Sequence, residues 1–339
     1  MSIRRTAVVA VVALTGALVA VTAPAASAAT CTPTYLPLPA GLPNGAVTAA
    51  DSGGGYAGYA YVVTRGLSMI IKAVRWSDGQ VTDLGQLGTS NVTVTGVNRQ
   101  GTVVGYVAGP RGFRSRDGKL EQLPTPSGYT GALVEGVNDN GDIVGSAVST
   151  PPDTAPYSIY TPVLWPASGS APVALTGLPT TGYAKAKAVD QDGTVLVEHY
   201  PARNSSSATA LYLWKAGTAR KLANPSDTTT VRGWSLSNGR VAGETYPASG
   251  YDGKGVLWDQ NGVPSRPAGS AYLRSINRSG QSVGWSTATG TYATWQLATR
   301  AATLTDRPSV DVSADNGTVA GRSVPSAGAN SLPTVWRCG

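Results

Sequence analysis

The residues that could do chemistry in this chain are few, and they form no recognisable catalytic motif. His199 is the single histidine. A Ser-His-Asp triad would need it as the base, but no Gly-x-Ser-x-Gly motif surrounds a candidate nucleophile. One histidine also excludes a metal site built from several histidines. The sequence therefore predicts no catalytic residue, no metal and no cofactor, and we interpret His199 as an ordinary loop residue.

Two acidic segments have the composition of a calcium-binding loop. They are 138–142 (Asn-Asp-Asn-Gly-Asp) and 190–193 (Asp-Gln-Asp-Gly). The full ligand series of such a loop ends in a glutamate, which neither segment has. Both segments coincide with the turn of a repeat described below, where Asn, Asp and Gly suit the backbone of a tight turn. We interpret them as turns.

The best candidate for a binding site is a row of polar residues, six positions before the first turn glycine of each repeat. The row consists of Thr48, Thr95, Glu135, Lys187, Gly233, Arg274 and Asp311. The residues just before the row are mostly apolar, as expected for a strand with one packed face and one face toward an open channel. The sequence predicts ligand binding at the mouth of this channel by Glu135, Lys187, Arg274, Asp311 and Thr95. The alternative is that these charges pair with one another or with water.

Three longer inserts form a second candidate surface. They span 149–161, 200–209 and 246–251 and are long and variable in composition. Mixtures of Tyr, Ser and Gly make adaptable binding surfaces, although they also occur in ordinary solvated loops.

The elements that position these residues come from a repeat of glycine, a short and often β-branched run, and a second glycine four residues after the first. In most copies an Asn or Asp lies three residues before the first glycine, which is typical of a hairpin turn. The copies begin at Gly54, Gly101, Gly141, Gly239, Gly280 and Gly317, with a degenerate copy at 193–197.

A tryptophan follows every copy of the repeat except the second, where Ser115 takes its place beside Phe113. The tryptophans are Trp76, Trp165, Trp214, Trp258, Trp295 and Trp336. We expect them to pack between units. Each unit reads as four strands in roughly 40–50 residues, which is the period of a propeller blade. The sequence therefore predicts an all-β fold, a seven-bladed β-propeller with four strands per blade.

The N-terminus predicts export. Arg4 and Arg5 precede an apolar run over 7–21, and Ala26-Ser27-Ala28 offers a cleavage site, so 1–28 is interpreted as a signal peptide. A single propeller domain then spans 29–339, secreted and without a membrane span in the mature chain. We expect its blades near 45–88, 89–128, 129–181, 182–228, 229–269, 270–307, and 308–339 together with 31–44.

The two cysteines test the closure of the ring. The last unit stops after its third strand, and the segment from Cys31 to Leu38 resembles a fourth strand. This N-terminal strand would complete the last blade and bring Cys31 next to Cys338. The sequence therefore predicts a disulfide between them, which is chemically reasonable in a secreted protein.

The pattern Asn-x-x-Gly-x-Val-Val-Gly, followed by an aromatic strand and then Asp-Gly-x-x-x-x-Leu-x-x-Leu, resembles the extracellular HAF repeat family. The best match combines 98–105 with 73–88. The resemblance covers nearly all of the chain after residue 28. It implies an exported repeat protein and carries over no catalytic residue.

Composition narrows the function further. The formal charge is +7 without any basic run, which argues against nucleic-acid binding. We expect a monomeric, non-enzymatic binding or scaffold protein whose ligand is a glycan, a cell-wall polymer or an extracellular protein. The alternative is a polysaccharide hydrolase or lyase that uses Glu135 and Asp311 at the channel mouth. A third possibility is a structural surface protein held by partners.

Overall fold

The computed structural model describes residues 29–150, 158–169, 171–248 and 252–338. These residues form 28 strands joined by turns and contain no helix. The segment interpreted as a signal peptide, 1–28, lies outside the described residues, as do parts of the inserts at 149–161 and 246–251. The prediction of an all-β fold is confirmed for the described part of the chain.

Twenty of the strands form five four-stranded antiparallel sheets, each built from consecutive strands. The first sheet has β2 (Asn44–Ala50), β3 (Tyr56–Val63), β4 (Met69–Ser77) and β5 (Gln80–Gly85); the second has β6 (Val92–Val97), β7 (Val103–Val107), β8 (Arg111–Arg116) and β9 (Lys119–Gln122). The third has β10 (Gly131–Val137), β11 (Ile143–Ser149), β12 (Ile159–Trp165) and β13 (Val173–Ala174); the fourth has β14 (Tyr183–Val189), β15 (Val195–Tyr200), β16 (Ala210–Lys215) and β17 (Thr218–Lys221). The fifth has β18 (Thr230–Ser237), β19 (Arg240–Tyr246), β20 (Lys254–Trp258) and β21 (Pro264–Ser265).

The other eight strands form one sheet, in the order β22-β23-β24-β25-β1-β28-β27-β26. Its strands are β1 (Ala29–Tyr35), β22 (Ser270–Ile276), β23 (Gln281–Ser286), β24 (Thr291–Gln296), β25 (Thr299–Leu304), β26 (Pro308–Ser313), β27 (Thr318–Ser323) and β28 (Leu332–Cys338). This differs from the expected set of separate four-stranded sheets. The reason is that β1 pairs on both edges, antiparallel with β28 and, through Ala29 to Cys31, parallel with β25. The second pairing satisfies an edge that would otherwise be free.

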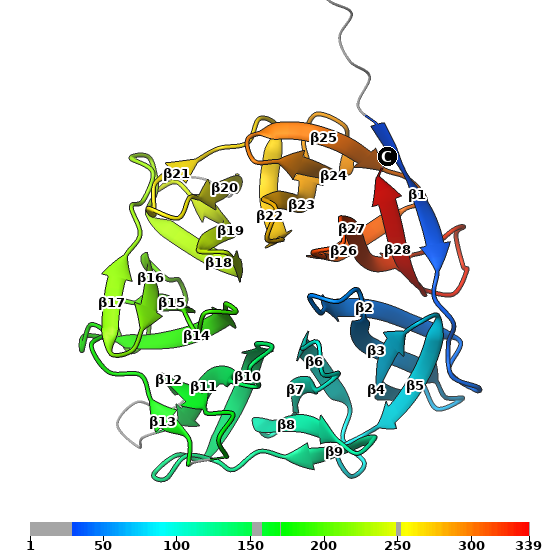
Figure 1. Ribbon diagram of the computed structural model, residues 1–339, viewed down its shortest axis with the longest axis horizontal. Coiled ribbons are helices and arrows are strands. Elements are labelled where there is room, and N and C mark those ends of the chain that lie inside the picture. The colour runs from blue at the N-terminus through cyan, green and yellow to red at the C-terminus, as the bar shows by residue number, and fades with distance from the viewer. Residues whose placement is uncertain (1–28, 151–157, 170, 249–251, 339) are drawn as a thin grey trace, which may run out of the picture.

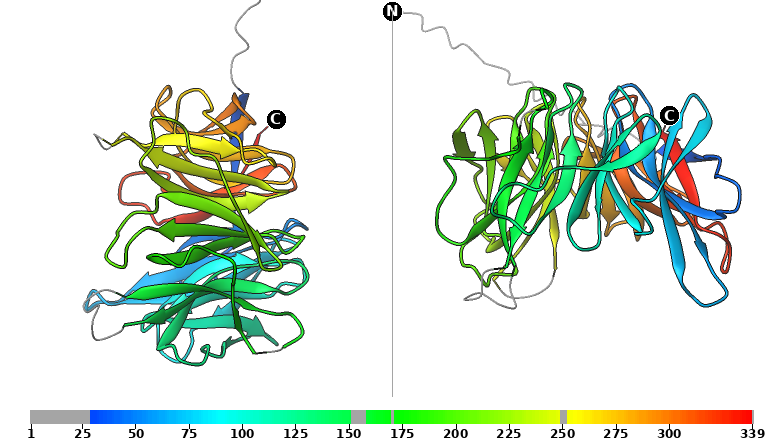
Figure 2. Two further views of the ribbon diagram at one scale, coloured as in Figure 1. Left: turned by 90° about the vertical axis from the view of Figure 1, so that its left-hand side faces the viewer. Right: turned by 90° about the horizontal axis from the view of Figure 1, so that it is seen from below.

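The sheets stand side by side around a ring, with β2, β6, β10, β14, β18, β22 and β26 nearest its centre (Figure 1). Each of these inner strands contacts the next one along the chain, and β26 contacts β2, so the ring is closed. Seen from the side, the molecule is a thick disc (Figure 2). The arrangement is a β-propeller-like fold.

The two ends of the described chain meet in the outer part of the eight-stranded sheet. Cys31 and Cys338 are cross-strand partners in the β1–β28 pair, and they form a disulfide with their Cα atoms 4.1 Å apart. The predicted disulfide is confirmed. The bond closes a loop of 307 residues in sequence separation, which makes it a long-range clamp on the ring.

Five of the six repeated tryptophans are packed between neighbouring sheets, as predicted, and Trp336 is packed between the two halves of the eight-stranded sheet. Trp76 is fully buried and belongs to the same core cluster as Val312 and Ala320 of the eight-stranded sheet. Its indole N–H donates to the Pro37 carbonyl at 2.7 Å, in the connection that leads into β2. Each of the other five makes the equivalent bond, to the carbonyls of Pro124, Thr176, Ala223, Ala268 and Thr305. The tryptophans therefore also fix the connections between sheets.

The spacing of the glycines, which recurs from one repeat to the next, has a geometric cause. The first glycine takes the left-handed backbone conformation of the turn, with φ +82° at Gly101. The second glycine lies where the inner strand bulges against it, and a Cβ on Gly105 would lie 2.0 Å from the Thr93 carbonyl oxygen. The same contact, at 1.9 to 2.1 Å, occurs at Gly58, Gly145, Gly243, Gly284 and Gly321. In the degenerate fourth copy Val197 stands at this place, and the inner strand β14 bulges there as well.

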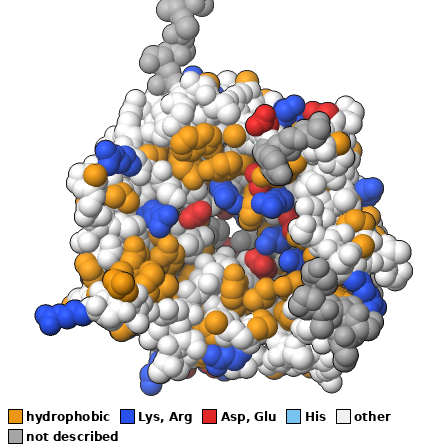
Figure 3. Space-filling model, turned by 180° about the vertical axis from the view of Figure 1, so that it is seen from behind, with side chains coloured by type: hydrophobic (Ala, Val, Ile, Leu, Met, Phe, Trp, Pro, Cys, Tyr) orange, Lys and Arg blue, Asp and Glu red, His pale blue; other side chains and the backbone are white. Residues whose placement is uncertain are grey.

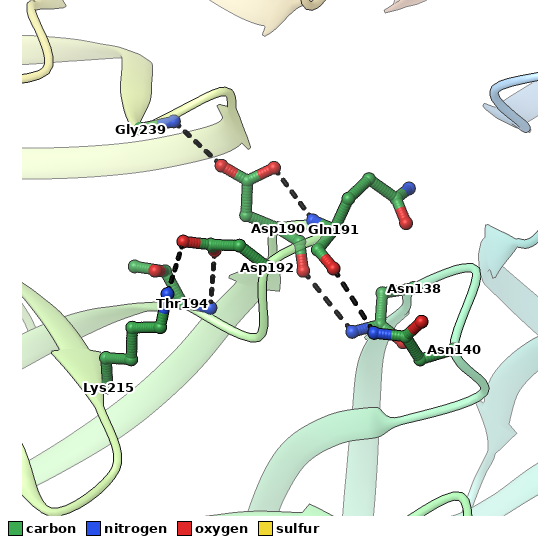
Figure 4. A network of polar contacts seen from close by, with 8 residues as sticks. All are labelled: Asn138, Asn140, Asp190, Gln191, Asp192, Thr194, Lys215 and Gly239. Atoms are coloured by element: carbon green, nitrogen blue, oxygen red, sulfur yellow. Dashed lines mark hydrogen bonds and ion pairs between the residues drawn. The ribbon is translucent and has the colours of Figure 1, made fainter.

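The turns at one end of the channel bond to one another from sheet to sheet (Figure 4). Asn138 is fully buried and accepts a bond from the Asp142 N–H while donating to the Asp190 carbonyl of the next turn. Asp190 in turn accepts from the Gly239 N–H at 2.7 Å. The amide and carboxylate groups of this network thus close their own turns and also tie adjacent sheets together.

The first testable prediction concerns the disulfide. We expect the Cys31→Ser/Cys338→Ser protein to melt about 5–10 °C below the parent, because the chain-entropy model assigns about 5–6 kcal/mol to a loop of this length. Differential scanning calorimetry measures the shift. Reductant should lower the melting temperature of the parent and leave the double variant unchanged. Equal melting temperatures of the two proteins would contradict the role of the clamp.

The second prediction concerns the bulge contact. Gly105→Ala should lower the free energy of unfolding by about 2–3 kcal/mol, because the added methyl meets backbone atoms that must shift. Gly66→Ala is the matched control, since a Cβ there meets nothing within 4 Å. Urea unfolding of both variants measures the difference. An equal loss of unfolding free energy at the two positions would contradict the explanation.

Candidate functional site

The centre of the ring holds a cavity of about 220 Å³. Its lining includes inner-strand and turn residues, and among them is one residue from the middle of each inner strand, namely Thr48, Thr95, Glu135, Lys187, Trp234, Arg274 and Asp311. In every inner strand this residue stands at the register shift of the bulge. A bulge changes the direction of a side chain relative to the regular strand. The bulges therefore supply the ring of side chains that lines the channel.

The predicted row is correct at six places and wrong at one. Gly233 was assigned to the channel, but Trp234 lines it, while Gly233 pairs with Gly243 in the sheet. The cause is the turn of this unit, in which Asn238 and Gly239 both have positive φ and form a two-residue hairpin. The turn is one residue shorter than in the other units, so counting back from Gly239 misses by one.

Glu135 and Lys187 are paired with each other. The Lys187 amine lies 3.3 Å from a carboxylate oxygen of Glu135, and both side chains are largely buried. Burial alone would lower the pKa of Lys187, but the carboxylates of Glu135 and Glu198 outweigh it and raise that pKa. For these two residues the expectation of mutual pairing holds, and neither is a free charge in the channel.

Arg274 lies against aromatic rings. Its guanidinium is 4.3 Å from the centroid of Trp234 and 5.1 Å from that of Tyr272. Within the described chain no carboxylate lies within 4 Å of it. The indole N–H of Trp234 donates to the buried carboxylate of Glu244 at 3.2 Å, which fixes the plane on which Arg274 rests. Arg274 therefore keeps its hydrogen-bond donors available to a ligand.

Asp311 faces the channel without an ion-pair partner among the described residues. Its side chain reaches channel solvent, but the surrounding groups remove part of its hydration, and this desolvation raises the pKa of the Asp311 carboxyl. Arg274 and Arg322 offset only part of the effect.

Thr48 and Thr95 use their hydroxyls within the fold. Each hydroxyl donates to a carbonyl of the next inner strand, Val94 at 2.8 Å and Val134 at 3.0 Å. Thr95, which was predicted to bind a ligand, thus has its donor engaged between two sheets.

A cluster around Lys185 was missed by the sequence reasoning. Lys185 lies 4.0 Å from the ring centroid of Tyr160 and 5.1 Å from that of Tyr200, and Tyr183 stacks on Tyr200 at 4.4 Å. Burial lowers the pKa of the Lys185 amine, and the charge of Lys187 lowers it further. The available signal was period-2 alternation, since Lys185 precedes Lys187 by two positions on the same strand.

Buried carboxylates support the Lys185 cluster and the stack of Arg274 on Trp234. Glu198 accepts hydrogen bonds from the Tyr200 hydroxyl at 2.8 Å and from the Gly233 N–H at 3.0 Å. In the fifth sheet, Glu244 lies 3.6 Å from the guanidinium of Arg232, its cross-strand partner. Tyr160, Tyr200 and Tyr246 come from the ends of the three inserts that the sequence singled out, so these inserts contribute side chains to the same region as the channel row.

The space-filling view shows Lys, Arg, Asp and Glu side chains gathered around a central hollow, with apolar side chains on its rim (Figure 3). Among the exposed apolar residues are Leu67, Met69 and Ile70, which lie in the β3–β4 hairpin. The hollow face is therefore mixed in character, charged at the centre and apolar around it.

The remaining sequence candidates show no catalytic arrangement. His199 lies in β15 rather than in a loop, is buried, and one ring nitrogen contacts the Thr181 carbonyl at 2.8 Å. The side-chain oxygens of the acidic segments at 138–142 and 190–193 accept hydrogen bonds within the turns, from the next turn, and from Ala167 and Lys215. Among the described residues, no three His, Cys, Asp or Glu side chains converge in a way that could hold a metal ion. None of the described elements is a helix able to cross a membrane.

Comparison with known proteins supports the fold and identifies no family or activity. No family model matches the chain, and no curated protein matches its sequence. A Pyrococcus horikoshii acylaminoacyl peptidase is similar with a TM-score of 0.57 and 10% identity, over 86% of this chain and 51% of that chain. The chain thus spans about half the length of that peptidase.

Two further solved structures are similar over most of both chains. A structure of YCF48 bound to D1 peptide has a TM-score of 0.51 and 12% identity, covering 91% of this chain and 96% of that one. A chain of a mitotic checkpoint complex has a TM-score of 0.51 and 14% identity, covering 97% and 98%. At such identities the likeness supports a β-propeller-like fold alone.

The third prediction follows from the raised pKa of Asp311. A carboxyl with a raised pKa binds its proton more tightly in the folded state, so its contribution to stability falls as pH rises from the ordinary value of about 4 through the raised value. Asp311→Asn should therefore melt above the parent at pH 7, and the advantage should shrink toward pH 3. Thermal melts across this range measure it. A parent that is more stable than the variant at pH 7 would contradict the argument.

Proposed function

We propose that this protein is a secreted, non-enzymatic binding propeller that holds a glycan or cell-wall polymer at the mouth of its channel. In this proposal the eight-stranded sheet counts as two blades joined by β1, which makes seven blades. The repeat pattern described above supports membership of the extracellular HAF repeat family. The disulfide between Cys31 and Cys338 is compatible with an oxidising compartment.

One observation carries the proposal: aromatic rings and charged groups with free hydrogen-bonding capacity lie together around the hollow. Arg274 offers donors above Trp234 and beside Tyr272. Sugars present apolar faces that pack on aromatic rings, and hydroxyls that need donors and acceptors at fixed positions. Asp311 supplies an acceptor on the neighbouring inner strand.

Hydrolysis of a polysaccharide is the alternative, and the charge pairing argues against it. A glycosidase needs one carboxyl as an acid and a second as a base or nucleophile at a set separation. The Glu135 carboxylate is engaged by the Lys187 amine at 3.3 Å and is not a free group in the channel, although burial outweighs this contact and raises the pKa of the Glu135 carboxyl. Asp311 is therefore left without an obvious partner for this chemistry.

The fourth prediction tests the binding site. Isothermal titration calorimetry with a panel of soluble polysaccharides and purified cell-wall fragments should find one that binds the parent. Arg274→Gln should weaken that binding about tenfold or more, because an arginine at an interface commonly contributes more than about 1 kcal/mol to binding. Arg278→Gln is the matched control, since Arg278 lies in the turn after the same strand.

Two results would overturn the proposal. The first is that no polymer in the panel binds, or that Arg274→Gln and Arg278→Gln bind as the parent does. The second is that the parent releases new reducing ends or unsaturated products from a polymer, and that Glu135→Gln or Asp311→Asn abolishes this turnover while binding persists. The second result would establish the hydrolase or lyase.

A further inference from the structure

The second sheet departs from the others at the repeated tryptophan. Ser115 pairs with Leu120 of β9 just as Trp76 pairs with Val81 of β5, so Ser115 occupies the tryptophan position. Its hydroxyl accepts a hydrogen bond from the Val103 N–H at 2.8 Å. The side chain is too small to fill the space that an indole takes in six other places of the chain.

Phe113 fills part of that space from two residues earlier. Its ring tip would lie 2.8 Å from a Cβ on Gly105, and the ring of Trp258 approaches Gly243 in the same way, at 3.2 Å. Phe113 is fully buried and packs with Leu84 and other core residues of the first two sheets. The inner part of the tryptophan position is thus filled, while the outer part is not.

A cavity of about 470 Å³ lies at this place. Leu84 and Ile143 form apolar parts of its wall, and Ser115 lies on the wall between them. The cavity also borders the turns that contain Gly101 and Gly141. None of the residues that line this cavity also lines the central one, so the cavity is separate from the site proposed above.

The polar wall of the cavity carries an excess of positive charge. It includes Arg75, Arg114 and Arg116 but only one carboxylate, that of Asp117. Arg114 and Arg116 share the nearby carboxylate of Glu121, at 2.5 and 3.4 Å. Three arginines against these two carboxylates leave an excess of one positive charge, which attracts a negatively charged ligand.

Arg75 is the cation without a partner. Its Nε is buried and makes no hydrogen bond, and no carboxylate of the described chain lies within 4 Å of it. The guanidinium lies close against the backbone of Gly101, where a Cβ would come within 2.3 Å of it. Gly101 therefore leaves room for Arg75 at the cavity wall, and a buried unsatisfied donor favours any ligand that supplies an acceptor.

We propose that this cavity binds a planar aromatic anion, such as an aryl carboxylate or aryl sulfonate. The aromatic group occupies the space of the missing indole beside Leu84, and the anionic group faces Arg75. Burial of a ring provides the apolar part of the binding energy, and the guanidinium provides a charge-assisted hydrogen bond.

The fifth prediction tests this assignment with three probes: indole-3-acetate, neutral indole and inorganic phosphate. Titration calorimetry on the full chain should show indole-3-acetate binding more tightly than either of the others. Arg75→Gln should weaken indole-3-acetate about tenfold and leave indole nearly unchanged. Arg99→Gln is the matched control, because Arg99 is exposed in the adjacent turn and does not line the cavity.

A second variant closes the cavity. Phe113→Val combined with Ser115→Trp restores the valine and tryptophan that the first sheet has at 74 and 76, so the fold should tolerate it. Indole-3-acetate should no longer bind this variant, while its melting temperature stays at or above that of the parent. If the variant melts lower, Arg75→Gln alone decides the question.

Three outcomes overturn the proposal. The first is a dissociation constant of indole-3-acetate for the parent above about 5 mM. The second is that indole-3-acetate binds the filled and Arg75→Gln variants as it binds the parent. The third is that phosphate alone binds as tightly as the aryl anion. None of these outcomes affects the polysaccharide proposal, because Arg274→Gln remains its own test.

Discussion

The closure of the ring is the constraint on which the rest of the molecule depends. Each inner strand borders two others, and β26 completes the circle against β2. Closure packs each sheet against its neighbours and leaves only the innermost and outermost strands as short edges, which limits a liability of open β-structures. It is achieved by the first described strand, which pairs with the last one and is joined to it by the only disulfide of the chain. Because a closed ring has a fixed circumference, every inner strand must present its side chains to one common channel.

The repeated glycines help to place one side chain of each inner strand in that channel. A glycine opposite six of the seven inner strands allows the backbones to approach, and the bulge in each inner strand, including β14 opposite Val197, directs one side chain into the channel. The residue at the bulge is itself free to vary, since no other part of the repeat fixes its type. Thr, Glu, Lys, Trp, Arg and Asp occupy this position. A uniform scaffold thus carries a non-uniform ring of functional groups.

The departures from the repeat mark the chemically distinctive places. The fourth unit replaces its second glycine with Val197 and contains the Lys185 cluster on the same pair of strands. The fifth unit shortens its turn and brings Trp234 into the channel. The second unit replaces its tryptophan with Ser115 and has a cavity there. Wherever the structural rule is broken, space or a charge becomes available for another role.

The sequence by itself determined the strand content, the turns, the burial of the tryptophans, the disulfide and six of the seven channel positions. These features follow from local patterns, because a glycine spacing, an Asn turn or a Trp position acts through neighbours a few residues away. Only the tertiary structure decided the pairing of Glu135 with Lys187, the stacking of Arg274 on Trp234, the Lys185 cluster and the second pairing of β1 with β25. Each of these depends on the distance between different strands. That distance is set by the circumference and tilt of the closed ring, and no single stretch of sequence records it.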